Sequence, residues 1–302
     1  MIIRYIIINL FIILLLISCQ SNNETNDSSK YTVVVTTNII ENTILNIVDT
    51  NYVNVFPLMK EGVDPHLYKA TRKDLELLNQ ADIIFYNGLH LEGKLAEVLD
   101  KLSRQKKVVA LADVLDKEKL IQVGEGIYDP HIWFDVVLWK EVTQYARNTL
   151  NENNIPTSKK NYISYLDQLD STNNWINKRI TNFPSKKRIL ITSHDAFSYL
   201  GRAYGIEVNA LLGISTVAEY GIKDINNLVD YIIENKVRSI FAETSVSSKS
   251  LEAIVAACQT RGHEVQLVSG LYSDALGKKD TKEGTYIGML ESNINKIVNS
   301  LN

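Results

Sequence analysis

The sequence is poor in cysteine, with two residues in 302, and in proline and histidine, with five of each. Cys19 follows an N-terminal hydrophobic run in a setting typical of lipidation, so Cys258 is the only other cysteine that could pair. We therefore expect no intrachain disulfide. Cys258 ends an apolar helical run over residues 253–257. It is therefore expected to be a small buried residue rather than a metal ligand.

An excess of basic residues is also missing. Lys and Arg number 32 against 35 Asp and Glu, for a net charge of −3, and the isoelectric point is near 6.0. Binding to nucleic acid normally needs a basic footprint, so we expect no nucleic-acid partner. The chain also lacks a His-Glu-x-x-His sequence, the helical zinc motif of many metalloproteases.

The one long hydrophobic run covers residues 2–17, in which Arg4 is the only charge. It falls slightly short of the ~20 residues that a permanent membrane-spanning helix needs, and it is typical of a signal peptide. The run ends Leu16-Ile17-Ser18-Cys19, the pattern of a bacterial lipobox. We therefore expect a lipoprotein signal peptide over residues 1–18, a lipidated Cys19 and a polar tether over residues 19–30. The alternative is an uncleaved membrane anchor.

Beyond the tether, strand and helix patterns alternate, which predicts an α/β fold with mainly parallel sheets. Strands are expected at residues 31–37, 52–57, 83–86, 108–111, 188–192, 207–210, 239–242 and 264–268. Helices are expected at residues 38–48, 71–79, 91–102, 134–151, 194–204, 219–235, 249–261 and 285–301. Four strand–helix cycles, a break and four further cycles indicate two lobes, each with a four-stranded sheet flanked by helices.

The break itself, residues 157–183, contains neither glycine nor proline. Its apolar residues recur at spacings of three, four and seven and form one helical stripe: Tyr162, Leu166, Leu169, Ile176, Ile180 and Phe183. We expect one long rigid helix that joins an N-terminal lobe (31–156) to a C-terminal lobe (184–302). Such a helix limits hinge bending between the lobes. The alternative is an ordinary helix belonging to one lobe.

Three of the five histidines stand in similar loop-like, Asp-flanked settings. Asp-Pro-His occurs at Asp64-Pro65-His66 and again at Asp129-Pro130-His131, and the third histidine opens His194-Asp195. Imidazole is the commonest metal-ligating side chain, and each histidine follows an expected strand, at the edge where doubly wound sheets bind ligands. The loop after the last strand offers one carboxylate, Asp274. We predict a metal site made of His66, His131, His194 and Asp274, two ligands from each lobe.

Several nearby residues are expected to have other roles. Asp64, Asp129 and Glu243 are candidates to brace the loops or to orient a ligand imidazole without contacting the metal. His90 is placed near a helix start and His263 in an exposed turn, and neither is expected to be a ligand. Asp274 has the alternative role of a turn residue.

The motifs resemble the zinc- and manganese-binding lipoproteins that serve ABC importers as substrate-binding proteins, of the TroA, ZnuA and PsaA type. The resemblance covers nearly all of residues 31–301 and rests on six segments in order: Gly62–Tyr68, Asn87–Glu92, Asp129–Trp133, Thr192–Phe197, Gly213–Glu219 and Leu271–Gly277. It implies two α/β lobes joined by one long helix. It also implies capture of a transported divalent metal ion, delivery to a permease with its ATPase, a monomer, and an extracytoplasmic location on a bacterial membrane through Cys19.

The transported metal is expected to be Zn²⁺ or Mn²⁺, with Fe²⁺ open as well. Three imidazoles and one carboxylate favour Zn²⁺, which stands above Mn²⁺ in the Irving–Williams order. However, dedicated zinc importers of the family often carry a histidine-rich acidic loop, and residues 113–128 contain no histidine. We expect zinc to be preferred and no enzymatic activity. The alternatives are a secreted zinc-dependent hydrolase, for which Glu219 or Glu243 would have to serve as base, and an adhesin-type surface lipoprotein.

Overall fold

The computed structural model describes residues 30–183 and 188–301. The expected signal peptide, the lipidation site Cys19 and the tether up to residue 29 lie outside the described residues. In the described part of the chain, no helix combines the length and the apolar character needed to cross a membrane.

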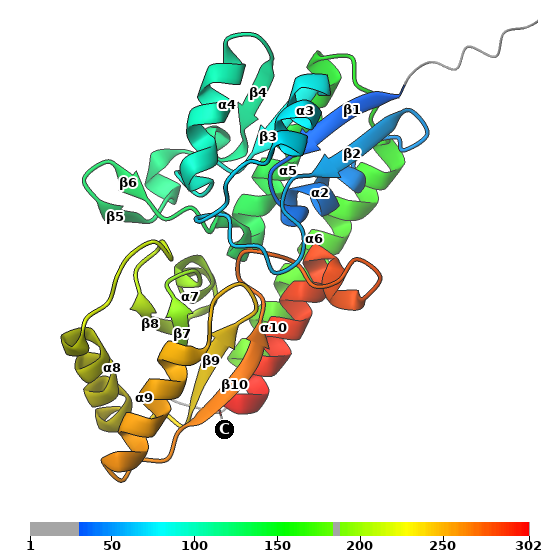
Figure 1. The fold of residues 1–302 in the computed structure, drawn as a ribbon. Coiled ribbons are helices and arrows are strands. Elements are labelled where there is room, and N and C mark those ends of the chain that lie inside the picture. Colours follow the sequence, from blue (N-terminus) through cyan, green and yellow to red (C-terminus); the bar gives the residue numbers. More distant parts are fainter. Residues whose placement is uncertain (1–29, 184–187, 302) are drawn as a thin grey trace, which may run out of the picture. The chain divides into compact units, whose positions relative to one another are not determined.

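The first half of the chain forms a four-stranded parallel sheet in the order β2-β1-β3-β4 (Figure 1). Its strands are β1 (Tyr31–Val35), β2 (Val53–Pro57), β3 (Ile83–Tyr86) and β4 (Lys107–Ala110). Its helices are α2 (Asn38–Leu45), α3 (Arg72–Gln80), α4 (Ala96–Ser103) and α5 (Val136–Glu152), with short 3₁₀ turns η1 (Gly93–Leu95), η2 (Leu111–Val114), η3 (Lys117–Lys119) and η4 (Ile132–Phe134).

The second half repeats this architecture with the strand order β10-β9-β7-β8, again all parallel. Its strands are β7 (Ile189–His194), β8 (Glu207–Leu212), β9 (Ser239–Glu243) and β10 (Gln266–Leu271). Its helices are α7 (Ser198–Tyr204), α8 (Ile222–Glu234), α9 (Lys249–Thr260) and α10 (Tyr286–Ser300), with the 3₁₀ turn η5 (Lys282–Gly284). The predicted pair of four-stranded parallel sheets flanked by helices is confirmed.

Local sequence explains where these elements begin. Thr71 and Asp74 form a capping box at the start of α3, and the Asp135 carboxylate accepts hydrogen bonds from the first turn of α5. The central strands consist of apolar and β-branched residues that are buried on both faces, as parallel sheets covered by helices require. In β7, for example, all six residues are buried.

The long helix α6 (Lys159–Thr181) runs for 23 residues between the two sheets in sequence, which corresponds to roughly 35 Å. Ser158 caps it by accepting a hydrogen bond from the Asn161 amide. It packs beside α10, where Arg179 donates to side chains of that helix. One continuous apolar cluster includes residues of the first sheet, α5, α6, α7 and α10, so the two halves share a core.

Three local features differ from the sequence-based expectation. A short hairpin of β5 (Gln122–Gly124) and β6 (Ile127–Tyr128) stands between β4 and His131, where we expected only a loop. The expected helix over 91–102 begins as the 3₁₀ turn η1, and the helix after His194 starts only at Ser198. These segments are too short to carry a clear periodic pattern, so their type could not be read from the sequence.

The buried face of α6 gives a test of the packing. Leu169 on this helix is fully buried, whereas Ile163 is 47% exposed. Replacing Leu169 by Ala removes packed methyl groups, so we expect the free energy of unfolding to fall by about 2–5 kcal/mol. Ile163→Ala serves as the matched control and should change it by less than about 0.5 kcal/mol. Urea denaturation followed by circular dichroism measures both, and equal effects would contradict this packing.

Candidate metal centre

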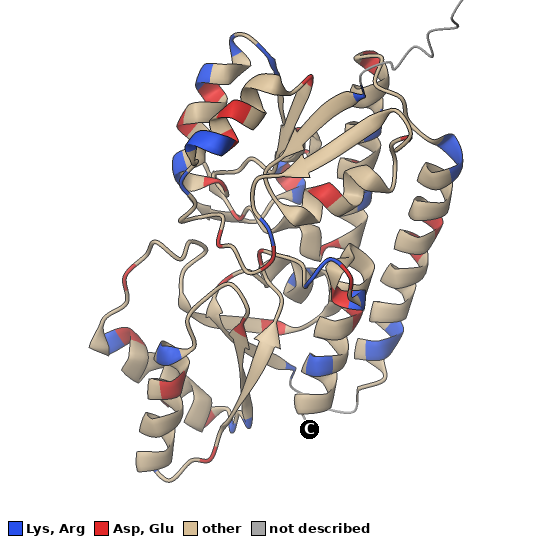
Figure 2. Ribbon diagram, turned by 45° about the vertical axis from the view of Figure 1, so that its right-hand side comes forward, with Lys and Arg blue, Asp and Glu red and all other residues tan. Residues whose placement is uncertain are grey.

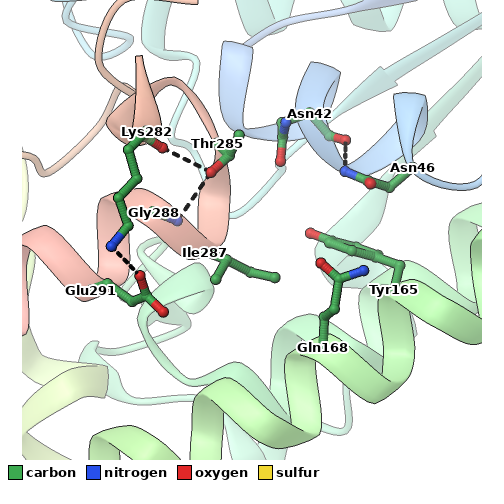
Figure 3. Close-up of a pocket in the computed structure, with 9 residues that line it drawn as sticks. All are labelled: Asn42, Asn46, Tyr165, Gln168, Lys282, Thr285, Ile287, Gly288 and Glu291. Carbon is green, nitrogen blue, oxygen red and sulfur yellow. Dashed lines mark hydrogen bonds and ion pairs between the residues drawn. The ribbon is translucent and has the colours of Figure 1, made fainter.

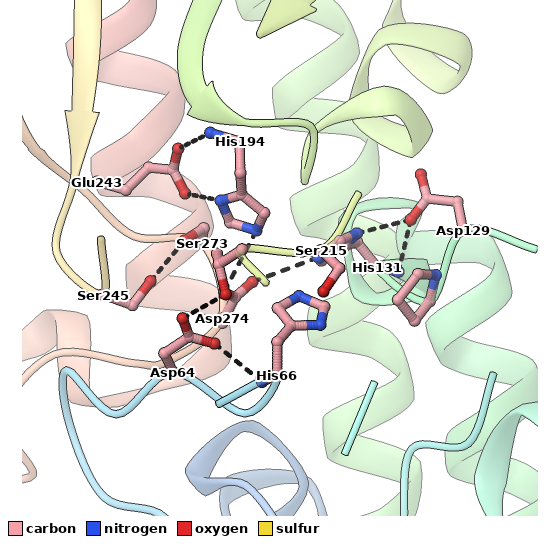
Figure 4. A network of polar contacts seen from close by, with 12 residues as sticks. Asp64, His66, Asp129, His131, His194, Ser215, Glu243, Ser245, Ser273 and Asp274 are labelled. Atoms are coloured by element: carbon pink, nitrogen blue, oxygen red, sulfur yellow. Dashed lines mark hydrogen bonds and ion pairs between the residues drawn. The ribbon is translucent and has the colours of Figure 1, made fainter. Parts of the chain in front are cut away.

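The structure brings together the four residues that the sequence singled out. One ligand atom from each of His66, His131, His194 and Asp274 lies within 4.8 Å of the others, and all four residues are buried. They come from both halves of the chain: two from loops after strands of the first sheet, one from the end of β7 and one from the loop after β10 (Figure 4).

His66 lies in the loop that follows β2. The Asp64 carboxylate closes this loop, because one of its oxygens accepts a hydrogen bond from the His66 amide at 2.9 Å. The other oxygen accepts from the Thr216 hydroxyl, in the second half of the chain, at 2.6 Å. Asp64 thus contacts both the loop of His66 and the opposite half of the chain.

His131 is held by the second Asp-Pro-His sequence in a related way. Asp129 Oδ1 accepts from the His131 amide at 2.9 Å and lies 2.6 Å from the ring atom Nδ1 (Figure 4). A proton on Nδ1 leaves the lone pair of Nε2 free to bind a cation. The Asp129 carbonyl in turn accepts a hydrogen bond from Tyr199 of α7 at 2.9 Å.

His194 is the last residue of β7 rather than the start of a helix. Glu243, the last residue of the neighbouring strand β9, accepts from the His194 amide at 3.0 Å and places its other oxygen 2.5 Å from Nδ1. The carboxylate thus controls both backbone and ring, as Asp129 does for His131.

Asp274 reaches the cluster because β10 is irregular at its end. The pairing with β9 shifts register between Ser269 and Leu271, around Gly270, which has a φ of 83°. Such a bulge changes the direction of the strand and is common next to binding sites. Beyond it, Trp133 donates to the Ser273 carbonyl at 3.0 Å and Asn38 pairs with the backbone of Leu276.

The spacing of these atoms fits a tetrahedral cation. Asp274 places one oxygen 3.5 Å from Nε2 of His131 and the other 3.3 Å from Nε2 of His194. Bonds of 2.0–2.1 Å, typical of zinc with nitrogen and oxygen ligands, separate neighbouring ligand atoms by about 3.3 Å. The three imidazole rings have centroid distances of 5.2–5.8 Å and turn edges toward one another.

The same atoms are left without hydrogen bonds. Within the described residues, Nε2 of His66, His131 and His194 and both carboxylate oxygens of Asp274 are buried and have no hydrogen-bond partner. Unpaired buried polar atoms are costly, and a native structure tolerates them where they serve another purpose. A cation at their centre would bind the three nitrogens together with one carboxylate oxygen, or with both oxygens if the carboxylate binds through both.

The charges of the site are strongly coupled. Burial lowers the pKa of His66 to about 3, so this imidazole stays neutral at physiological pH. Burial also opposes the charged form of His194, but Asp274 and Glu243 outweigh it and raise the pKa of His194 well above its usual value. Burial alone would raise the pKa of Asp274; the neighbouring histidines instead hold it well below the usual range. A proton on His194 thus partly substitutes for a cation.

The other candidate residues lie outside this cluster. His90 is exposed in the turn after β3 and is not part of it. His263 is half-buried rather than exposed, because its ring contacts the Val237 carbonyl at 2.7 Å, a partner distant in sequence. Cys258 is fully buried, as expected.

Sequence reasoning missed several residues that position the site. Trp133, Tyr199 and Asn38 each form a hydrogen bond that links a segment near the cluster in one half of the chain to the other half. Trp133 lies in the Asp129–Trp133 motif, but its type and position in the sequence give no signal of its contact with Ser273. These roles depend on packing between distant segments.

A separate cavity of about 210 Å³ lies among α2, α6 and α10 (Figure 3). Part of its polar lining is paired internally: Lys282 pairs with Glu291, and Thr285 accepts from the Gly288 amide. The group of side chains among the described residues that could hold a metal ion is the His66, His131, His194 and Asp274 cluster.

In the view of Figure 2, basic and acidic residues are interspersed along the helices rather than gathered by sign.

Comparison with known proteins identifies the family and agrees with the fold. A family described as zinc-uptake complex component A, periplasmic, matches residues 33–300. The manganese-binding lipoprotein MntA of Bacillus subtilis is 44% identical over 255 residues, 83% of either chain. The zinc-binding protein TroA of Treponema pallidum is 40% identical over 272 residues, 89% of this chain and 88% of that protein.

Solved structures show the same architecture. The periplasmic zinc-binding protein TroA from Treponema pallidum superposes with a TM-score of 0.85 and covers 90% of this chain and 99% of that one, at 40% identity. Fe(III)-bound YtgA from Chlamydia trachomatis gives a TM-score of 0.78 at 26% identity, with 90% and 98% covered. The family resemblance inferred from the motifs is confirmed.

The carboxylate behind His194 provides a test of how the cluster is built. Glu243→Gln keeps the shape but weakens the hold on Nδ1, so we expect the affinity for Zn²⁺ to fall by about 10–100-fold, as for other partners of metal-bound histidines. Calorimetric titration of the purified protein measures it. Glu234→Gln, an exposed position on α8, is the control and should bind as the unmodified protein does. Unchanged affinity in Glu243→Gln would contradict an orienting role.

Proposed function

The chain belongs to the family of periplasmic zinc-uptake complex component A proteins, and from this premise we propose that it captures a divalent transition-metal ion outside the cytoplasm and delivers it to an ABC permease. His66, His131, His194 and Asp274 are the proposed ligands. The observation that carries the proposal is the set of buried, unpaired nitrogen and oxygen atoms that lie within 4.8 Å of one another. The Asp274 oxygens lie 3.5 Å and 3.3 Å from Nε2 of His131 and His194, close to the separation of neighbouring ligand atoms around a tetrahedral zinc ion.

The proposed cargo is Zn²⁺ or Mn²⁺. Three imidazole nitrogens and one carboxylate suit Zn²⁺, and they place it well above Mn²⁺ in affinity for a given site. Mn²⁺ prefers more oxygen ligands, and Asp274 could supply a second one by binding through both oxygens. The named relatives include both a manganese-binding and a zinc-binding protein. The preference for zinc therefore rests on the chemistry of the donor set.

The remaining assignments extend this role. Lipidation of Cys19 would hold the protein at the outer face of a bacterial membrane, through the tether before Tyr31. The partners would be an importer permease and its ATPase, and the protein would act as a monomer. The lobes would cover residues 31–156 and 184–302, with the helical segment 157–183 between them. Release would separate the His66/His131 pair from the His194/Asp274 pair.

A hydrolase would use the same metal differently. A catalytic zinc commonly has three protein ligands and an open position for water. In Asp274→Ala, a binding protein should lose most of its affinity, whereas a hydrolase could keep metal on three histidines. The four-ligand cluster supports binding over catalysis, and an adhesin role has no comparable support in the site.

The first measurement is calorimetric titration of chelator-stripped protein beginning after Cys19. We expect one Zn²⁺ per chain, with binding that excess Mn²⁺ barely weakens, and a large loss of affinity in Asp274→Ala. Strong competition by Mn²⁺ would move the assignment to manganese or mixed-metal transport. No stoichiometric binding of either ion would overturn the proposed function.

Binding should also depend on pH. Because Asp274 and Glu243 raise the pKa of His194 against the effect of burial, a metal ion must displace a proton from that imidazole at neutral pH. Lower pH favours the proton, so we expect the apparent affinity for Zn²⁺ to fall about tenfold for each pH unit between pH 7.5 and 5.5. Titrations at three pH values in this range measure the slope. A flat profile would contradict binding through these histidines.

A further inference from the structure

The turn between β3 and α4, Asn87–Gly93, contains a buried acid that takes no part in the metal cluster. Glu92 is 1% exposed, and its motif segment, Asn87–Glu92, has no role assigned from the sequence. Burying a carboxylate away from any cation is expensive unless it accepts several hydrogen bonds. The contacts of Glu92 therefore indicate what the turn does.

The Glu92 carboxylate gathers three donors. It accepts from the Thr36 hydroxyl at 2.8 Å, from the Asn87 amide at 2.6 Å and from the Gly88 amide at 3.2 Å. Thr36 follows β1 and Asn87 follows β3, so the carboxylate joins the ends of two central strands. Burial raises the pKa of Glu92, and these hydrogen bonds counteract the rise.

One end of the turn holds the loop of His131. The side-chain amide of Asn87, which is 1% exposed, donates to the Pro130 carbonyl at 2.9 Å. Pro130 immediately precedes His131. The position of the second ligand loop is thus fixed by a residue whose own backbone is fixed by Glu92.

The other end of the turn abuts the loop of His66. Gly93 has a φ of 42°, and a Cβ atom at this position would lie 2.4 Å from the His66 carbonyl oxygen. Real Cβ atoms do not approach oxygen so closely, so the backbone of His66 can take its present position only against a glycine. Between the two ends, Leu89 and His90 have φ values of 52° and 66°, a conformation that non-glycine residues adopt only under constraint.

We propose that the turn Asn87–Gly93, organised by Glu92, is a positioning element that sets the separation of the two first-half ligands, His66 and His131. This inference rests on the proposed metal-binding function, and it gives the turn the role of setting the positions of the two ligands from the first half of the chain. Their ring centroids lie 5.5 Å apart. A shift of either loop changes the distance between the two imidazole nitrogens and therefore the fit to a cation, without changing any ligand.

A pair of glycine variants tests this. Gly93→Ala introduces the clash with the His66 carbonyl, whereas Gly126→Ala, in the β5–β6 turn, has a similarly positive φ of 68° and no atom within 4 Å of the added Cβ. Both variants place a side chain at a positive φ, but only in Gly93→Ala does the added Cβ contact the loop that carries His66. The readouts are Zn²⁺ affinity by calorimetry, the visible absorption of the Co²⁺-loaded protein, which reports ligand geometry, and thermal unfolding of the metal-free protein.

We expect Gly93→Ala to weaken Zn²⁺ binding by about 10–100-fold and to alter the Co²⁺ spectrum, while Gly126→Ala matches the unmodified protein in both. Equal effects in the two variants, no effect in either, or a loss of affinity with an unchanged Co²⁺ spectrum would overturn the proposal. If the unmodified protein binds neither Zn²⁺ nor Co²⁺, the proposed function itself fails.

If Gly93→Ala does not fold, Glu92→Gln decides. The amide keeps the shape of the side chain but turns an NH₂ group toward the backbone donors of the turn. The altered spectrum and the weaker binding are expected here too, and Glu97→Gln, exposed on α4, is the control. Binding and spectrum equal to those of the control would overturn the proposal.

Discussion

Three imidazole nitrogens and one carboxylate face one another inside the protein without hydrogen-bond partners among the described residues. The surrounding structure depends on this constraint, because groups of this kind are stable together only when a cation or a shared proton lies between them. Each half of the chain supplies two of the four residues. The cluster therefore joins the two halves, and a cation bound there would act on both.

The histidines do not define the site alone. Asp129 and Glu243 each hold a backbone amide and the Nδ1 atom of the same histidine, so the metal-facing nitrogen is determined twice, through the main chain and through the ring. Asp64 holds only the backbone of His66, because its other oxygen accepts a hydrogen bond from Thr216. The rings of His131 and His194 are thus each held by a carboxylate, whereas no carboxylate holds the ring of His66, whose backbone lies against Gly93.

Much of this could be predicted from the sequence, for physical reasons. Buried parallel strands such as β3 (Ile83–Tyr86) are short runs of apolar and aromatic residues, and the apolar stripe on α6 repeats at helical spacing along its 23 residues, so both patterns are strong. His66, His131, His194 and Asp274 could be proposed because the Asp-flanked histidines and the last carboxylate lie at or after the ends of the expected strands. The β5–β6 hairpin, the bulge at Gly270 and the contact of Asn87 with Pro130 could not. They arise from close approach of distant backbone segments, which leaves no periodic trace.

The contacts across the halves bear on release. Besides the cluster itself, Trp133 donates to Ser273, Tyr286 donates to Trp133, and Thr216 donates to Asp64. Each such hydrogen bond contributes on the order of 1 kcal/mol, and none of them involves a metal ligand side chain. Separation of the His66/His131 pair from the His194/Asp274 pair would break these bonds in addition to the bonds to the proposed metal ion. A cation would therefore not leave simply because its own bonds weaken, and the proposed permease would have to compensate for the lost contacts between the halves.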